Sequence, residues 1–340
     1  MSQQSESIAV PRTARRTGPG RDAVLAAVQR WGLVGVLAVV VAGFSALSPD
    51  LFATKANAQD ILNAQPPVMF VALAAVLVLL VGEFDLSLGA TLGLAQYLVL
   101  ELITTTGLSW PAAVVVTLAV GALIGAINAG FVVGLGVNSF VATIGMSTVL
   151  VGVIEWMSGG NAPIVQAPPD GFTRLAQTEI AGVALPVLYA LGAAGVLWVV
   201  LEHTVFGREM RATGANRTAA RLSGLRTRRA LVTAFVGAGV LASIGGMLIT
   251  ARVGAADATS GPGYLLPAYA AAFLGATAIR PGLFNVWGTV IAIFLVAVGI
   301  TGLQLEGAAS WVTPVFNGVV LLLAVTVSMV AARRRGAARS

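Results

Sequence analysis

The sequence predicts an all-α fold: a polytopic membrane helix bundle of about ten transmembrane helices, N-in and C-in. Of its 340 residues, 57% are hydrophobic and 10% are charged, and the mean hydropathy is +0.90. Soluble domains carry about 25% charged residues. The apolar runs are continuous rather than alternating, which favours membrane helices over the strands of a barrel. The 40 glycines suit closely packed membrane helices.

Ten apolar runs divide residues 31–332, which form the expected transmembrane domain. A bilayer core of about 30 Å requires about 20 helical residues, and the shorter runs reach this length with their flanks. Residues 1–30 are expected to be a retained basic tail rather than a signal peptide, and residues 333–340 a second tail. The expected spans are 31–47, 65–81, 86–105, 111–133, 139–157, 184–203, 230–250, 264–279, 284–303 and 311–331.

The positions of the positive charges predict the orientation, because Lys and Arg favour the cytoplasmic side of a membrane. With the N-terminus inside, ten spans place seventeen of the twenty Lys and Arg residues on that side. This bias accounts for the net charge of +6 better than binding to nucleic acid does. The outer connections 48–64, 159–183 and 251–263 either meet a partner protein or only close the helix ends.

The longest polar interruption between spans, residues 204–229, carries seven arginines. Within it, Asn216 is expected to cap a short helix over 217–223, because its side chain can accept a backbone N–H bond at a helix start. Ala219 and Ala220 are small, so another surface could approach this helix closely. The loop is either a positive-inside anchor alone or a docking element for an acidic cytosolic partner.

A resemblance to a known family favours docking. The order Ala219-Ala220-x-x-x-Gly224 resembles the coupling loop of ABC-importer permeases, and the string FGREMRATGANRTAARLSGL is similar to that loop in permeases for ribose, galactose, xylose and autoinducer 2. The chain departs from the wider family at Thr218, where a Glu is common, and in lacking a downstream Ile-x-Leu-Pro. The second departure suits the sugar branch.

Three further stretches resemble the same sugar branch, so the resemblance covers most of the chain from Gly82 onward. They are GEFDLSLGATLGL from Gly82, VNSFVATIGM from Val137 and AAFLGATAIRPGLFNVWGTVIA from Ala271. The first departs from the usual pattern at Glu83, where a second Gly is common. The match is specific for the family and weak for the substrate.

The resemblance implies a non-catalytic permease subunit of an ABC importer for a simple sugar or sugar-like solute, in a bacterial inner membrane. Its implied partners are cytosolic ABC ATPase subunits, an extracytoplasmic solute-binding protein, a second permease copy or sister permease, and membrane lipid. No cofactor or metal is expected. The residues expected to couple to the ATPase are Arg208, Arg211, Asn216, Ala219, Ala220, Arg221 and Gly224.

The turn between the second and third spans contains Gly82, Asp85 and Ser87. Asp85 can cap the third span, since a carboxylate accepts N–H bonds at a helix start. Alternatively, the turn borders the substrate path or a partner interface.

Uncharged polar residues inside the spans are candidates for the translocation path. Gln96, Asn128, Thr143 and Asn317 fall within the third, fourth, fifth and tenth spans. Amides donate and accept, so they can exchange hydrogen bonds with a sugar. The alternative is hydrogen bonding between helices. Small-residue spacing at Gly121-x-x-x-Gly125 and Gly130-x-x-x-Gly134 also predicts close helix packing.

The sequence lacks features that other classes of transporter require. The spans lack the mid-membrane charges typical of proton- or sodium-driven transporters, and the chain has no P-loop for ATP and no cysteine. The driving force is therefore expected from another subunit. The alternatives are a permease for nucleosides or branched-chain amino acids, a secondary transporter or channel, and a non-transporting membrane scaffold.

Overall fold

The computed structural model describes residues 19–159, 164–165, 168–257 and 259–337. These residues are mostly helical. The helices are α1 (Pro19–Leu47), α2 (Lys55–Ala64), α3 (Pro66–Leu80), α4 (Leu88–Thr104), α5 (Trp110–Ala129) with a π-helical continuation (Gly130–Gly134), α6 (Ser139–Ser158), α7 (Asp170–Gln177), α8 (Leu185–His203), α9 (Val205–Ala215), α10 (Arg217–Leu222), α11 (Thr227–Val253), α12 (Gly261–Gly275), α13 (Val286–Leu305) and α14 (Val312–Ala337).

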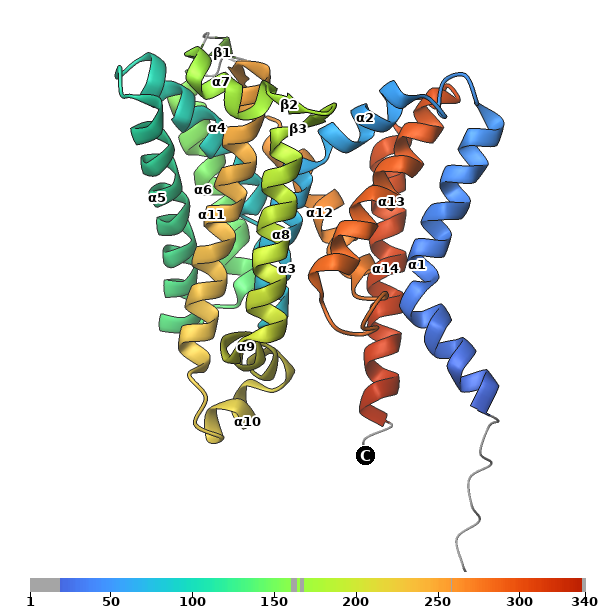
Figure 1. Cartoon of the computed structure of the whole chain (residues 1–340). Coiled ribbons are helices and arrows are strands. Elements are labelled where there is room, and N and C mark those ends of the chain that lie inside the picture. The colour runs from blue at the N-terminus through green and yellow to red at the C-terminus, as the bar shows by residue number, and fades with distance from the viewer. Residues whose placement is uncertain (1–18, 160–163, 166–167, 258, 338–340) are drawn as a thin grey trace, which may run out of the picture.

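Two short antiparallel ladders complete the described fold. Strand β1 (Ile164–Val165) pairs with β4 (Ala255–Ala256), and β2 (Glu179–Ile180) pairs with β3 (Val183–Ala184). Both ladders lie at the end of the bundle where α7 is found, opposite the end formed by α9 and α10 (Figure 1). The described start of α1 and the end of α14 lie toward the α9–α10 end.

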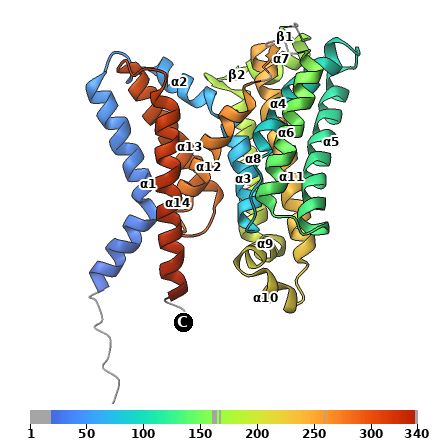
Figure 2. The same cartoon turned by 180° about the vertical axis from the view of Figure 1, so that it is seen from behind.

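The long helices run side by side between these two ends (Figures 1 and 2). Helix α11 packs against α3, α4 and α5, while α12 packs against α3, α4, α13 and α14. Helix α3 is apolar on all sides, and 13 of its 15 residues are buried, as expected of a helix inside a bundle. Helix α2 crosses the α7 end between the group of α1, α13 and α14 and the other long helices.

The membrane spans agree only in part with the ten predicted from sequence. Among the described residues, five helices are long and apolar enough to cross a membrane: α5 with its π-helical end, α6, α8, α11 and α13. The pair α2–α3 passes the same test together, with a bend of 41°. Shorter apolar helices cover Trp31–Leu47, Leu88–Thr104 and Val312–Ser328. The fold is that of a multi-pass helical membrane protein, and the count of ten spans stays a prediction.

Several predicted boundaries are wrong. The expected eighth span, 264–279, is a helix of only 15 residues, α12, which ends at Gly275. Helix α1 begins inside the predicted tail 1–30, and α14 continues beyond residue 332 to Ala337. Hydropathy alone does not identify these two helix extensions, because their sequences are too polar. The rest of the predicted tails, 1–18 and 338–340, lies outside the described residues.

One of the two predicted small-residue faces is a packing surface. A Cβ built on Gly121 would lie 2.1 Å from the Ser243 hydroxyl oxygen, and one on Gly125 would lie 2.2 Å from the carbonyl oxygen of Phe235. Glycine therefore lets α5 approach α11 at backbone contact. Gly130 and Gly134, in contrast, face open space among the described residues.

Candidate functional site

The α9–α10 pair, residues 205–222, forms the polar end of the bundle. Thr204 caps α9, because its hydroxyl accepts a hydrogen bond from the backbone N–H of Gly207 at 3.3 Å. Asn216 caps α10 in the same way, with its Oδ1 accepting from the N–H of Ala219 at 2.9 Å. The predicted cap and short helix are confirmed, although α10 ends at Leu222 rather than at residue 223.

Gly224 ends this pair with a left-handed backbone. Its φ is +80°, and the N–H of Leu225 returns to the carbonyl oxygen of Ala220 at 3.1 Å. Side chains other than glycine are disfavoured at this φ, so the residue shapes the exit of α10. The two alanines differ: Ala219 is exposed, while Ala220 is buried against its own chain. Leu222 is 85% exposed.

The pair rests directly on the turn between α3 and α4. A Cβ built on Gly214 would lie 2.1 Å from the carbonyl oxygen of Leu80, so α9 and the turn meet at backbone distance. Arg217, at the start of α10, forms an ion pair with Glu83 in that turn. A displacement of α10 therefore acts on this turn.

A second contact joins α9 to the turn between α12 and α13. The carboxylate of Glu202, at the end of α8, pairs with Arg211 of α9 and with Arg280 of that turn. Arg211 also donates to the carbonyl oxygen of Phe284 at 3.3 Å. Arg211 was predicted to face the ATPase, but its side chain is only 18% exposed and is engaged within the chain.

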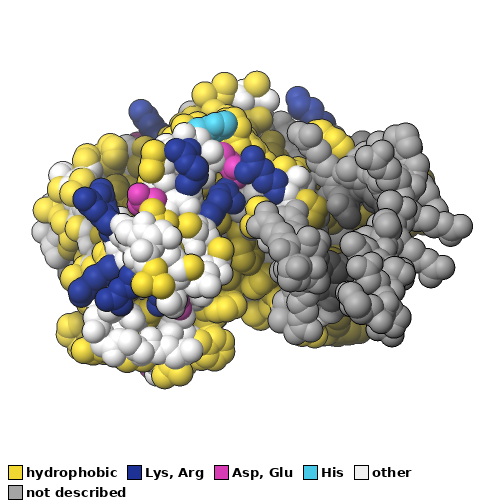
Figure 3. Space-filling view, turned by 90° about the horizontal axis from the view of Figure 1, so that it is seen from below, with side chains coloured by type: hydrophobic (Ala, Val, Ile, Leu, Met, Phe, Trp, Pro, Cys, Tyr) yellow, Lys and Arg dark blue, Asp and Glu magenta, His cyan; other side chains and the backbone are white. Residues whose placement is uncertain are grey.

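The exposed arginines at this end form a basic surface. Figure 3 views the bundle from the α9–α10 end and shows Lys and Arg side chains gathered there, with few acidic ones. Arg208 and Arg221 are exposed. Both side chains are accessible from this end, and their role in coupling stays a prediction.

The α3–α4 turn contains a buried polar cluster around Asp85, which is 1% exposed. Its Oδ1 accepts from the backbone N–H of Ser87 at 2.9 Å and from the Ser87 hydroxyl at 2.6 Å. The amide of Asn128, on α5, donates to the Ser87 hydroxyl at 2.8 Å. Asp85 therefore closes a turn at Ser87, the residue just before α4, but the predicted cap on the helix itself is wrong, because α4 has no side-chain cap hydrogen bond.

Two other helices hold the same turn. The hydroxyl of Tyr269, on α12, accepts from the N–H of Asp85 and donates to its carbonyl oxygen, both at 2.9 Å. From α6, the hydroxyl of Thr143 accepts from the N–H of Leu86 at 3.0 Å, and that of Ser139 from the N–H of Phe84 at 3.2 Å. The backbone of the turn is thus fixed to α12 and α6.

Burial determines the electrostatics of this turn. Desolvation raises the pKa of the Asp85 carboxyl above its usual value, and hydrogen bonds from Ser87 and Asn128 lower it in part. Each of these donors favours the charged form. The arrangement therefore suits a structural carboxylate that holds a turn together.

Replacing Asp85 by leucine is expected to destabilise the protein by about 1–3 kcal/mol, because it leaves the buried N–H and hydroxyl of Ser87 without their acceptor. Asp85→Asn keeps one acceptor oxygen and serves as the matched control, with a smaller loss. Unfolding of the purified protein by denaturant measures both. Equal stability of the leucine variant and the wild type would contradict this account.

The proposed path residues are buried in this structure. Asn128 and Thr143 belong to the turn cluster, and Gln96 donates to the Ser260 hydroxyl at 2.8 Å. The Oδ1 atom of Asn317 is buried and has no hydrogen-bond partner among the described residues. Three of the four thus make the helix-to-helix contacts weighed as the alternative, and their role in a path stays a prediction.

Sequence reasoning missed the residues that join the elements. Glu202 and Tyr269 were not singled out, and Glu83 was noted only as a departure from a family pattern. Apart from Arg211, which is nine residues from Glu202, their partners lie far away in the chain, so no local spacing indicates them. In the described part of the chain, no group of three or more His, Cys, Asp or Glu residues could hold a metal ion.

These observations define the class of protein: a multi-pass helical membrane protein in which a basic helix pair contacts two inter-helix turns. A family model described as "Branched-chain amino acid transport system / permease component" matches residues 57–325. The chain belongs to this family of transport permeases.

Curated relatives extend over most of the chain. The ribose import permease protein RbsC of Escherichia coli K12 is 34% identical over 86% of this chain and 91% of its own length. The D-allose transport system permease protein AlsC of the same strain is 28% identical, covering 87% and 90%. The autoinducer 2 import system permease protein LsrD of Salmonella typhimurium LT2 is 29% identical, covering 75% and 78%. No solved structure matches the chain.

Proposed function

We propose that this chain is the transmembrane permease subunit of an ATP-binding-cassette importer for a simple sugar or sugar-like solute. It would cross a bacterial inner membrane ten times with both ends in the cytosol. The observation that carries the proposal is the similarity to permeases named for ribose, D-allose and autoinducer 2, each over at least 75% of this chain. Partners of this subunit would be ATPase subunits, a solute-binding protein and a second permease.

The ties of the α9–α10 pair support a mechanical role. Movement of a bound ATPase would displace α10, and the Arg217–Glu83 ion pair and the Gly214 contact would pass that movement to the α3–α4 turn. Glu202 would pass it to the α12–α13 turn. Tyr269 also joins α12 to the α3–α4 turn. A movement of either turn would therefore act on α12. A rigid-body shift of this kind suits alternating access.

The cargo is inferred from the relatives rather than from the family description. That description names branched-chain amino acids, whereas the three relatives above are named for sugars or for autoinducer 2. A zwitterionic amino acid needs complementary charges along its path, and the proposed path residues are uncharged. We therefore favour a neutral, hydroxyl-rich solute.

The α7 end supports docking of a solute-binding protein. It carries α2, α7 and the two short ladders. Arg252, at the end of α11, donates to the carbonyl oxygen of Asn63 at the end of α2. Such cross-links between outer connections would let a docked protein act on several helices together.

Reconstitution tests this proposal. The permease, purified with its ATPase and solute-binding subunits and placed in vesicles, is expected to accumulate ribose, allose or a related solute only when ATP is present. An ionophore should leave the uptake unchanged. Accumulation of leucine would instead favour an amino acid permease, and concentrative uptake by the lone polypeptide under an ion gradient would identify a secondary transporter and refute the proposal.

A further inference from the structure

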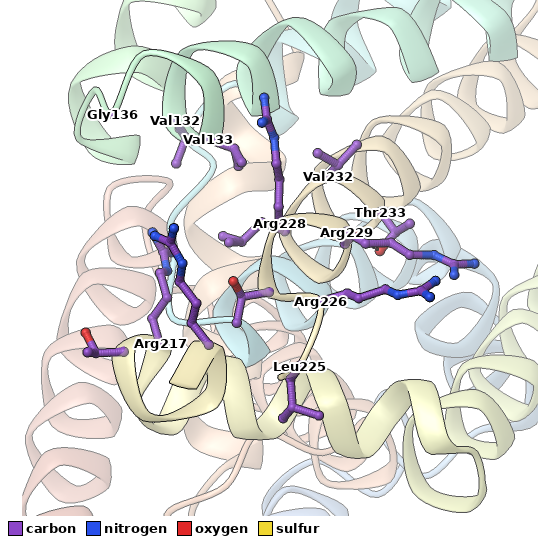
Figure 4. Close-up of a pocket in the computed structure, with 14 residues that line it drawn as sticks. Val132, Val133, Gly136, Arg217, Leu225, Arg226, Arg228, Arg229, Val232 and Thr233 are labelled. Carbon is purple, nitrogen blue, oxygen red and sulfur yellow. Dashed lines mark hydrogen bonds between the residues drawn. The ribbon is translucent and has the colours of Figure 1, made fainter. Parts of the chain in front are cut away.

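A basic groove lies beside α10, between the start of α11 and the π-helical end of α5. Its volume is about 1040 Å³. Figure 4 shows the side chain of Arg228 extending toward Val132 and Val133, while Arg226 and Arg229 extend to the other side. The arginines that line the groove are Arg217, Arg221, Arg226, Arg228 and Arg229.

The positive charge of this groove is largely uncompensated. None of the described residues that line it is acidic. Arg217 is paired with Glu83, but no ion pair within the described residues involves the other four arginines. A guanidinium group offers several N–H donors in a fixed plane that matches the oxygens of a phosphate. The groove therefore fits a phosphate-bearing anion.

Part of the groove wall is apolar. Val132 and Val133 line it from the end of α5, and Leu231 and Val232 line it from α11. Beside this wall, Leu135 is 74% exposed. A ligand that fills the groove would therefore carry both an anionic group and hydrocarbon.

The depth of the groove also indicates the ligand. Two helices long and apolar enough to cross a membrane flank it: Trp110–Gly134 ends here and Thr227–Val253 begins here. The arginines thus lie where an apolar span gives way to water, at the depth of lipid headgroups. A docked cytosolic protein would instead meet the outer side of α10, where Ala219 and Leu222 are exposed and do not line the groove.

We propose that this groove binds the headgroup of an anionic phospholipid, with its phosphate on the arginines and the upper part of its acyl chains along the valines. The site goes beyond the transport function and does not require the ATPase. A lipid bound there would occupy the inner side of α10 and the base of α11.

The test uses the purified full-length permease without other subunits. Native mass spectrometry counts bound phosphatidylglycerol and phosphatidylcholine with the same acyl chains. The wild type is expected to retain phosphatidylglycerol preferentially, and less so at higher ionic strength. The double variant Arg221→Gln/Arg228→Gln is expected to bind phosphatidylglycerol about 25-fold more weakly, since each arginine near the surface contributes about fivefold. Its binding of phosphatidylcholine should not change.

Arg208→Gln is the matched control, because it removes an exposed arginine of the same pair that does not line the groove. This variant should bind phosphatidylglycerol like the wild type. An equal loss in the control would show a diffuse basic surface and overturn the site. So would equal retention of both lipids by the wild type. If the double variant keeps its phosphatidylglycerol, the groove is not the lipid site and the proposal is wrong, while the transport function stands.

Discussion

Replacing Gly125 by leucine is expected to prevent α5 and α11 from packing. A Cβ at this position would lie 2.2 Å from the carbonyl oxygen of Phe235 and 2.8 Å from the Cα of Val236. The opposing atoms are backbone in a buried helix, so no side-chain rearrangement relieves the contact. Overpacking usually costs about 1–3 kcal/mol and sometimes more, and a clash between two helix backbones falls at the upper end or beyond it.

Size-exclusion chromatography and unfolding in mixed detergent micelles measure this effect. The Gly125→Leu variant should be aggregated or unfold at much lower denaturant than the wild type. Gly192→Leu on α8 is the control, since Gly192 is exposed and a Cβ there meets no atom within 4 Å. A monodisperse Gly125→Leu protein of normal stability would show that α5 and α11 are not in backbone contact.

Replacing Ala219 by tryptophan is expected to abolish most ATP-driven uptake while leaving the protein folded and inserted. Ala219 is exposed on α10, so the larger side chain does not disturb the chain itself. It would separate α10 from a docked ATPase, and a loss of about 1.4 kcal/mol in that contact weakens association tenfold. Ala219→Ser keeps the small size and should transport normally.

The comparison with Ala220 sharpens this prediction. Ala220 is 5% exposed and its carbonyl oxygen accepts the N–H of Leu225. Tryptophan at this position would therefore distort the end of α10 itself. A loss of transport in the Ala220→Trp variant could come from this distortion, so it would not show that α10 contacts the ATPase. Uptake into vesicles, ATPase co-purification and the amount of inserted protein separate the two variants. Normal uptake by Ala219→Trp would refute docking at this face.

Local patterns were enough to predict much of this fold. Apolar runs located the long helices, because a membrane span must be continuous and apolar. The cap at Asn216 was predictable because its donor, the N–H of Ala219, lies three residues away. Gly121 and Gly125 indicated a close helix contact through their spacing, but not the identity of the partner helix.

Contacts between distant parts of the chain could not be predicted. Tyr269 meets Asp85 across 184 residues, and nothing near either residue encodes that pairing. Asn128 was a candidate path residue because an amide inside a span can bind a solute or a neighbouring part of the chain equally well, and its contact with Ser87 could not be read from the sequence. Helix α12 was predicted as the span 264–279, but it begins at Gly261 and ends at Gly275, because hydropathy does not define where a helix begins or ends.

The sharing of Glu202 determines how this end of the molecule can move. Arg211, largely withdrawn from water, would be left without a counter-ion if α9 shifted away from α8, and isolating a sheltered charge is expensive. Arg280 forms an ion pair with the same Glu202 carboxylate. The end of α8, α9 and the α12–α13 turn are therefore favoured to move together as one rigid unit.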